Sequence, residues 1–355
     1  MQQWLRKTFV FDDENARLIS MEGLRGLAVT LVFLVHYTTL ARPWVAASSF
    51  SGQVIDVLHS VGNTGVDLFF VLSGYLIYGT LIEKHKPFGR YFLRRIERIY
   101  PTFLVVTLLY LVLSFAFPAE SKIPRDVGAG GLFVLQNLLF MPGIFNVQAI
   151  NTVTWSLSYE MFYYLIIPAI IPLLGLRNWS RERRIQFFIV ALLVLAVLFW
   201  QFGGPARMMM FIAGIVLYEL VTKGVRLRQE NGLGLVAIAL GIMTVWVLHG
   251  KGVSLQVLLL CLFFGYGCFA CFCVEDGARG VTRAVFCWRP MRWLGNMSYS
   301  YYLIHGLTIK FFFMVLAKVF PPRADQAGVM WALLPVAFMM TLVTSAVLFM
   351  MVEKP

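Results

Sequence analysis

The chain has 355 residues, of which 59% are hydrophobic and 14% are charged, and its mean hydropathy is +0.75. A soluble globular protein carries about 25% charged residues, so this chain lacks the polar surface that a water-exposed domain needs. The composition excludes a disordered chain, a collagen-like fibre and a soluble nucleic-acid-binding domain, in spite of a net charge of +12. We therefore expect an integral membrane protein.

Apolar runs close to the ~20 residues that cross a bilayer favour helices over barrel strands, which would alternate apolar and polar residues. The expected fold is an all-α polytopic membrane protein. Ten spanning helices are predicted, over residues 24–41, 65–82, 99–118, 154–174, 185–201, 207–222, 232–249, 253–274, 294–318 and 329–352. A further apolar segment, 128–142, is short, rich in glycine and bounded by Pro142, which is typical of a re-entrant or interfacial segment.

The basic residues predict the topology. Clusters within 84–98 and 177–184 both favour the cytoplasm, so an even number of crossings must separate them. This condition is met if 128–142 does not span, and both termini are then cytoplasmic. The net positive charge is thus mainly a topology signal, with anionic membrane lipids as its default partner and no nucleic acid.

The first residues carry charges of both signs and no apolar core, which a cleaved signal peptide would need. We expect 1–17 to be a cytoplasmic arm and 18–355 to be one transmembrane domain. The cysteines lack the second pair of ligands that a zinc site would need, so no metal is expected.

Function is sought among polar residues that a bilayer makes costly. Arg25 and His36 lie eleven residues apart on one predicted helix, hence on nearly the same face and about 16 Å apart along the axis. Asp67 begins the next helix, at about the depth of His36, where it could orient an imidazole or simply favour the helix dipole. Taken singly, Arg25 is explained by snorkelling, and Ser73 by close helix packing.

Three arginines at Arg94, Arg95 and Arg98 suit phosphate oxygens, although a plain positive-inside cluster is the simpler explanation. Glu160 lies within a predicted span, where an ionised carboxylate needs a partner or a role.

Two other residues have an ordinary structural explanation. Trp155 is explained by anchoring at the membrane interface. His305 is explained by a hydrogen bond between helices, or it is a second functional imidazole.

Five motifs occur in an order that resembles the membrane-bound acyltransferase-3 family, and the resemblance covers roughly residues 18–355. The matching residues are Arg25 and His36; Gly65, Val66, Asp67, Phe69, Phe70, Ser73 and Gly74; Arg95 and Arg98; Trp155 to Glu160; and Ser298 to His305, with Glu353 and Pro355 at the end. Some relatives fuse an SGNH-hydrolase-like domain after the membrane part, and no such domain is expected within this chain.

The resemblance implies a multi-pass O-acyltransferase of the bacterial inner membrane. It would move an acyl group, usually acetyl, from cytosolic acetyl-CoA to a hydroxyl of a surface polysaccharide or lipid-linked glycan, without a metal. The implied roles follow from the family motifs. His36 would be the general base or, less simply, the acyl carrier, and Asp67 or Glu160 would orient it. The residues that would hold CoA are Arg25, Arg94, Arg95 and Arg98. The residues that would contact the substrates are Ser73, Trp155, Tyr299 and His305.

The alternative is a proton-coupled transporter or flippase of a glycan or lipid, in which His36, Asp67 and Glu160 form a proton relay. Transporters often contain internal repeats, and none is found in this sequence.

Overall fold

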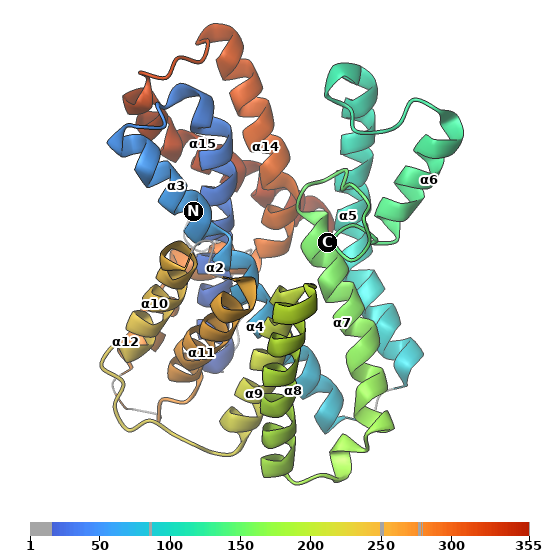
Figure 1. The fold of residues 1–355 in the computed structure, drawn as a ribbon, viewed down its shortest axis with the longest axis vertical. Coiled ribbons are helices and arrows are strands. Elements are labelled where there is room, and N and C mark those ends of the chain that lie inside the picture. Colours follow the sequence, from blue (N-terminus) through green and yellow to red (C-terminus); the bar gives the residue numbers. More distant parts are fainter. Residues whose placement is uncertain (1–15, 85–86, 249–251, 276–277, 279, 355) are drawn as a thin grey trace.

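The structure is a computed structural model, and it describes residues 16–84, 87–248, 252–275, 278 and 280–354. Over these residues the chain is helical, and extended pairing is limited to four isolated β-bridges. The expected all-α fold is confirmed. The predicted N-terminal arm lies outside the described residues, except for its last two positions, which begin the first helix of Figure 1.

Ten helices overlap the ten predicted spanning segments. They are α2 (Ala16–Ala41), α4 (Thr64–Glu83), α5 (Phe88–Ala116), α7 (Thr154–Leu173), α8 (Arg181–Phe202), α9 (Met209–Thr222), α10 (Leu233–Val247), α11 (Val253–Phe272), α14 (Ser298–Val319) and α15 (Ala327–Leu348). The helices α2 and α5 begin well before the predicted starts. Eight helical stretches of the described chain are long and apolar enough to cross a bilayer. The helices α9 and α10, with 14 and 15 residues, fall short of a full crossing. The chain is thus a multi-pass membrane protein.

Four shorter helices lie between these elements. They are α3 (Phe50–Gly62), α6 (Val127–Leu138), α12 (Val281–Phe286) and α13 (Arg289–Asn296). The predicted span 294–318 begins too early, because its first residues belong to α13. The backbone leaves the helical conformation at Met297, and α14 begins at the next residue. The residues on both sides of the break, from Gly295 to Ser300, are mostly small or polar, so the sequence carries a local sign of it that the predicted span overlooked.

The helix α6 explains why segment 128–142 does not add a crossing. It has twelve residues and begins at the N-cap Asp126, whose carboxylate accepts the backbone N–H of Ala129 at 2.8 Å. Its length of about 18 Å is well short of the ~30 Å hydrocarbon thickness. Figure 1 shows α6 beside the upper half of α5, with α7 continuing toward the opposite end of the molecule. This arrangement agrees with the predicted re-entrant or interfacial segment.

The centre of the bundle is built by close packing of α4 on α9. A Cβ atom added at Gly74 would lie 2.2 Å from the carbonyl oxygen of Phe211, and one added at Gly214 would lie 2.1 Å from that of Val71. The rings of Phe70 and Phe211 stack beside this contact at 4.5 Å. The backbones of α4 and α9 therefore approach each other closely, as membrane helices do where small residues lie between them. This contact holds α4 in place, and its opposite face can line a site.

Candidate functional site

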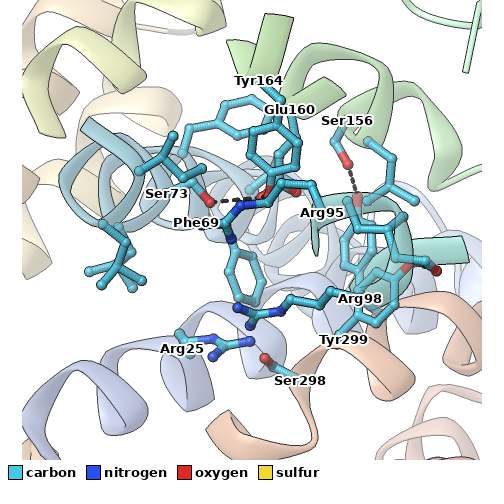
Figure 2. Close-up of a pocket in the computed structure, with 18 residues that line it drawn as sticks. Arg25, Phe69, Ser73, Arg95, Arg98, Ser156, Glu160, Tyr164, Ser298 and Tyr299 are labelled. Atoms are coloured by element: carbon cyan, nitrogen blue, oxygen red, sulfur yellow. Dashed lines mark hydrogen bonds between the residues drawn. The ribbon is translucent and has the colours of Figure 1, made fainter. Parts of the chain in front are cut away.

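A small cavity of about 110 Å³ lies inside the bundle, between α2, α4, α5, α7 and α14 (Figure 2). Five separate helices contribute its polar side chains. These are Arg25; Ser73; Arg95 and Arg98; Ser156, Glu160 and Tyr164; and Ser298, Tyr299 and Tyr302. Six of the eleven predicted site residues are among them, and so the structure brings together motifs that are far apart in the sequence.

Helical spacing explains how α7 supplies three of these groups. Ser156, Glu160 and Tyr164 follow one another at intervals of four residues and so share one face of the helix. Glu160 has the partners that its position within a span requires. Its Oε1 atom accepts a hydrogen bond from the Ser73 hydroxyl at 3.0 Å and another from the hydroxyl of Tyr164.

Three arginines converge on the same cavity. The guanidinium of Arg95 lies 5.5 Å from the ring centroids of both Tyr91 and Tyr164. Figure 2 shows the guanidinium groups of Arg25 and Arg98 close together, beside Ser298. Among the described residues, no carboxylate forms an ion pair with any of the three arginines. Like charges repel strongly away from bulk water, so this arrangement favours an anion between them.

Arg94 does not belong to this group. Arg94 and Arg98 are both exposed, but of the three arginines on α5 only Arg95 and Arg98 line the cavity. Arg94 points about 100° away from Arg95 around α5, and it lies one helical turn before Arg98, nearer the start of the helix. The expectation that Arg94 contacts the same ligand is therefore not supported by its placement.

A second and larger cavity, of about 610 Å³, lies between α2, α5, α14 and α15 and the segment before α7. His36 lines it, together with mainly apolar side chains of α5 and α14. Charged groups at its edge include Lys310 and Glu120, which form an ion pair at 2.7 Å. One helix, α2, thus carries Arg25 in the small cavity and His36 in the large one.

The contacts of His36 include a second imidazole. Its ring lies 4.9 Å from the ring of His305, at an interplanar angle of 66°. Among the described residues, no hydrogen bond joins the imidazole of His36 to Asp67 or Glu160. Orientation of His36 by either carboxylate therefore stays a prediction.

Asp67 belongs to a third cluster, outside both cavities. Its Oδ2 atom lies 3.2 Å from Nη1 of Arg207, which also donates to the carbonyl oxygen of Asn63. The guanidinium of Arg207 lies 6.0 Å from the ring centroid of Trp155. Trp155 therefore contacts the residue that neutralises Asp67 and lines neither cavity.

Sequence reasoning missed several residues of this site. Ser156 and Tyr302 lie within quoted motifs without an assigned role, although Ser156 is one helical turn before Glu160 and could have been found by that spacing. Arg207 is the first residue of the predicted span 207–222, and no signal in the sequence joins it to Asp67, which is 140 residues away.

Comparison with known proteins gives the family. A family model described as an acyltransferase domain matches residues 18–350, nearly the whole chain. The chain belongs to the acyltransferase-3 family. The expectation of an acyl-transferring enzyme is confirmed, and the alternative of a transporter finds no support. No solved structure matches the chain.

Several curated proteins are similar to this chain, and their names specify acyl or O-acetyl transfer. Acyltransferase MdmB of Streptomyces mycarofaciens is 26% identical over 329 residues, which cover 83% of this chain and 80% of that protein. Peptidoglycan O-acetyltransferase OatA of Listeria monocytogenes is 26% identical over 379 residues, covering 95% of this chain and 55% of that protein. O-acetyltransferase OatA of Staphylococcus aureus is 25% identical over 83% of this chain. The chain spans about half the length of both OatA proteins.

Proposed function

We propose that this family member transfers an acyl group, acetyl in the first instance, from acyl-CoA to a hydroxyl of a surface or lipid-linked glycan. One observation carries the proposal. Arg25 and His36 lie on the same face of α2, one lining the small cavity of unpaired arginines and the other the larger apolar cavity. The names of the OatA relatives, which specify O-acetyl transfer and in one case peptidoglycan, support the reaction type.

The donor end of the proposed site is the small cavity. Arg25, Arg95 and Arg98 would bind the phosphate groups of CoA, because guanidinium groups form charge-assisted and often bidentate hydrogen bonds with phosphate oxygens. The separation of about 16 Å between Arg25 and His36 along α2 is of the order of an extended pantetheine arm. Phosphates held near the arginines would therefore allow the thioester to reach toward His36.

The acceptor end is the larger cavity. There His36 would act as a general base and take the proton of an acceptor hydroxyl. The hydroxyl oxygen would then form a bond to the thioester carbonyl carbon, and the carbon–sulfur bond would break. The proton would pass from His36 to the departing CoA thiolate, so that the enzyme returns to its starting state. The apolar lining of the cavity suits an acceptor that carries a lipid.

The experiment measures release of CoA from acetyl-CoA by purified protein in detergent, and acetyl esters on surface glycans by mass spectrometry of cells with and without the chain. His36→Gln should reduce turnover by about a hundredfold or more, since an amide takes up no proton. His59→Gln is the matched control, because His59 is an exposed histidine on the neighbouring α3.

Two results would contradict the proposal. Near wild-type turnover in His36→Gln would remove the imidazole from the chemistry. Unchanged acetyl ester content of the glycans in cells that lack the chain would contradict the proposed acceptor class.

A further inference from the structure

We infer that His305 is a positioning residue for His36: the lone pair of its Nε2 atom accepts one ring N–H of His36 and so leaves the other His36 nitrogen free as the base. This inference rests on the proposed function, in which His36 takes the acceptor's proton. It assigns to His305 a role different from the substrate contact that the sequence motif implied.

The tautomer of His305 follows from its hydrogen bond. Its Nδ1 atom lies 2.9 Å from the backbone carbonyl oxygen of Tyr301. A carbonyl oxygen accepts and does not donate, so Nδ1 must carry the hydrogen and, in the neutral ring, Nε2 must carry the lone pair. The ring of Tyr301 stacks on the imidazole at 5.3 Å and 14°, which holds the plane of the ring.

The Nε2 atom is an acceptor that lacks a donor. His305 is fully buried, and its Nε2 has no hydrogen-bond partner among the described residues. A buried polar atom without a partner is unfavourable and uncommon in folded proteins. The imidazole of His36 is the ring closest to His305, at 4.9 Å between centroids, and a neutral imidazole carries one N–H to donate. In the structure no hydrogen bond joins the two rings, so the inference requires the His36 ring to turn until its N–H points at Nε2.

The tautomer of His36 decides whether it can act as a base. If its N–H pointed into the large cavity, that nitrogen could not accept the proton of a hydroxyl. A hydrogen bond from His36 to His305 fixes the N–H on the inner side and the lone pair on the cavity side. After proton uptake the imidazolium keeps the same hydrogen bond, which is the orienting role that a carboxylate has in Ser-His-Asp triads.

The carboxylates that could have had this role are occupied elsewhere. Asp67 is paired with Arg207 through Oδ2, and Glu160 accepts hydrogen bonds from Ser73 and Tyr164. The other oxygen of Asp67, Oδ1, has no hydrogen-bond partner among the described residues, so it is not bonded to His36 either. The neutral imidazole of His305 is therefore the acceptor that the structure offers to His36.

Two substitutions at His305 separate positioning from structure. In His305→Asn the amide nitrogen can still donate to the Tyr301 carbonyl, but no atom remains at the place of Nε2. In His305→Gln the longer side chain brings its amide oxygen to the place of Nε2, but the bond to Tyr301 is lost. A positioning role predicts that His305→Asn lowers kcat by about a hundredfold without changing KM for acetyl-CoA, and that His305→Gln retains clearly more activity. A purely structural role predicts the reverse order.

The outcomes separate this inference from the proposed function. Wild-type kcat in His305→Asn, together with an inactive His36→Gln, would overturn positioning and leave His36 as the base. An active His36→Gln would overturn the proposed base itself. A measurement on the wild-type protein remains if the variants fail to fold. In protein with ¹⁵N-labelled histidine, magnetic resonance should find the proton of His305 on Nδ1 and a single His36 tautomer, and a protonated Nε2 on His305 would overturn the inference.

Discussion

The hydroxyl of Tyr302 lies 2.5 Å from Oγ of Ser156, and this hydrogen bond lies between the residues that line the two cavities. Both residues line the small cavity, whereas Val153, whose carbonyl accepts a hydrogen bond from the Tyr302 hydroxyl at 3.2 Å, lines the large one. The ring of Tyr302 also lies 6.1 Å from that of His305. A thioester that reaches His36 from the arginines must therefore pass Ser156 and Tyr302.

The Ser156–Tyr302 pair predicts how a variant at Tyr302 behaves. Tyr302→Ala should open the small cavity toward the large one and admit water to the thioester, because exclusion of water suppresses hydrolysis of reactive groups. We expect the ratio of acetyl-CoA hydrolysis to glycan transfer to rise. Tyr302→Phe keeps the ring and should change this ratio little. The two products are measured in one assay, as free acetate and as acetyl ester. An unchanged ratio in Tyr302→Ala would show that Tyr302 does not separate the two ends.

The α4–α9 contact predicts a loss of stability without a change in chemistry. Gly214→Ala places a methyl group against the carbonyl oxygen of Val71, 2.1 Å away, so the helices must move apart. Overpacking of this kind costs about 1–3 kcal/mol. The thermal midpoint in detergent should fall. Gly265→Ala on α11 is the matched control, because a Cβ atom there meets open space and its midpoint should stay near that of the wild type. Equal midpoints for the two variants would refute the prediction.

Local features of the site were predictable because they depend on helical geometry within one segment. Arg25 and His36 share a face of α2 because eleven residues make just over three whole turns. Glu160 was expected to have a partner because an ionised carboxylate within a span is costly, and Ser73 and Tyr164 provide hydrogen bonds. These arguments need no knowledge of how the helices pack.

Pairings between segments were not predictable in the same way. Equal depth in the membrane suggested that Asp67 faces His36, but depth does not give the direction in which a helix turns its side chains. In the structure Asp67 faces Arg207, and His36 faces His305 on α14. The break between α13 and α14 differs, because the small and polar residues from Gly295 to Ser300 mark it in the sequence.

The charge distribution predicts which end of the molecule faces the cytoplasm. In Figure 1 the start of α5 and the turn between α7 and α8 lie at one end, and the turn after α5 at the other. Phe88→Cys and Asn178→Cys, both at exposed positions, should resist an impermeant thiol reagent applied outside intact cells, and Glu120→Cys should react. The wild-type protein controls for its own cysteines, four of which are buried. Labelling of Asn178→Cys from outside would reverse the assigned sides.

The last prediction tests whether the cluster of unpaired arginines binds the donor. Arg98→Ala should weaken CoA binding about ten- to a hundredfold, since a hydrogen bond to a charged group contributes roughly 1.5–3 kcal/mol. Arg98→Lys should restore only part of the affinity, because an ammonium does not reproduce the guanidinium fork. Arg94→Ala is the matched control: it removes the same charge four residues away, from a side chain outside the cavity, and should change affinity little. Calorimetric titration of CoA into each variant in detergent gives the dissociation constants.

Equal losses of CoA affinity in Arg94→Ala and Arg98→Ala would show that the arginines act only through general electrostatic attraction. Unchanged affinity in both would leave the cluster as a topology signal alone.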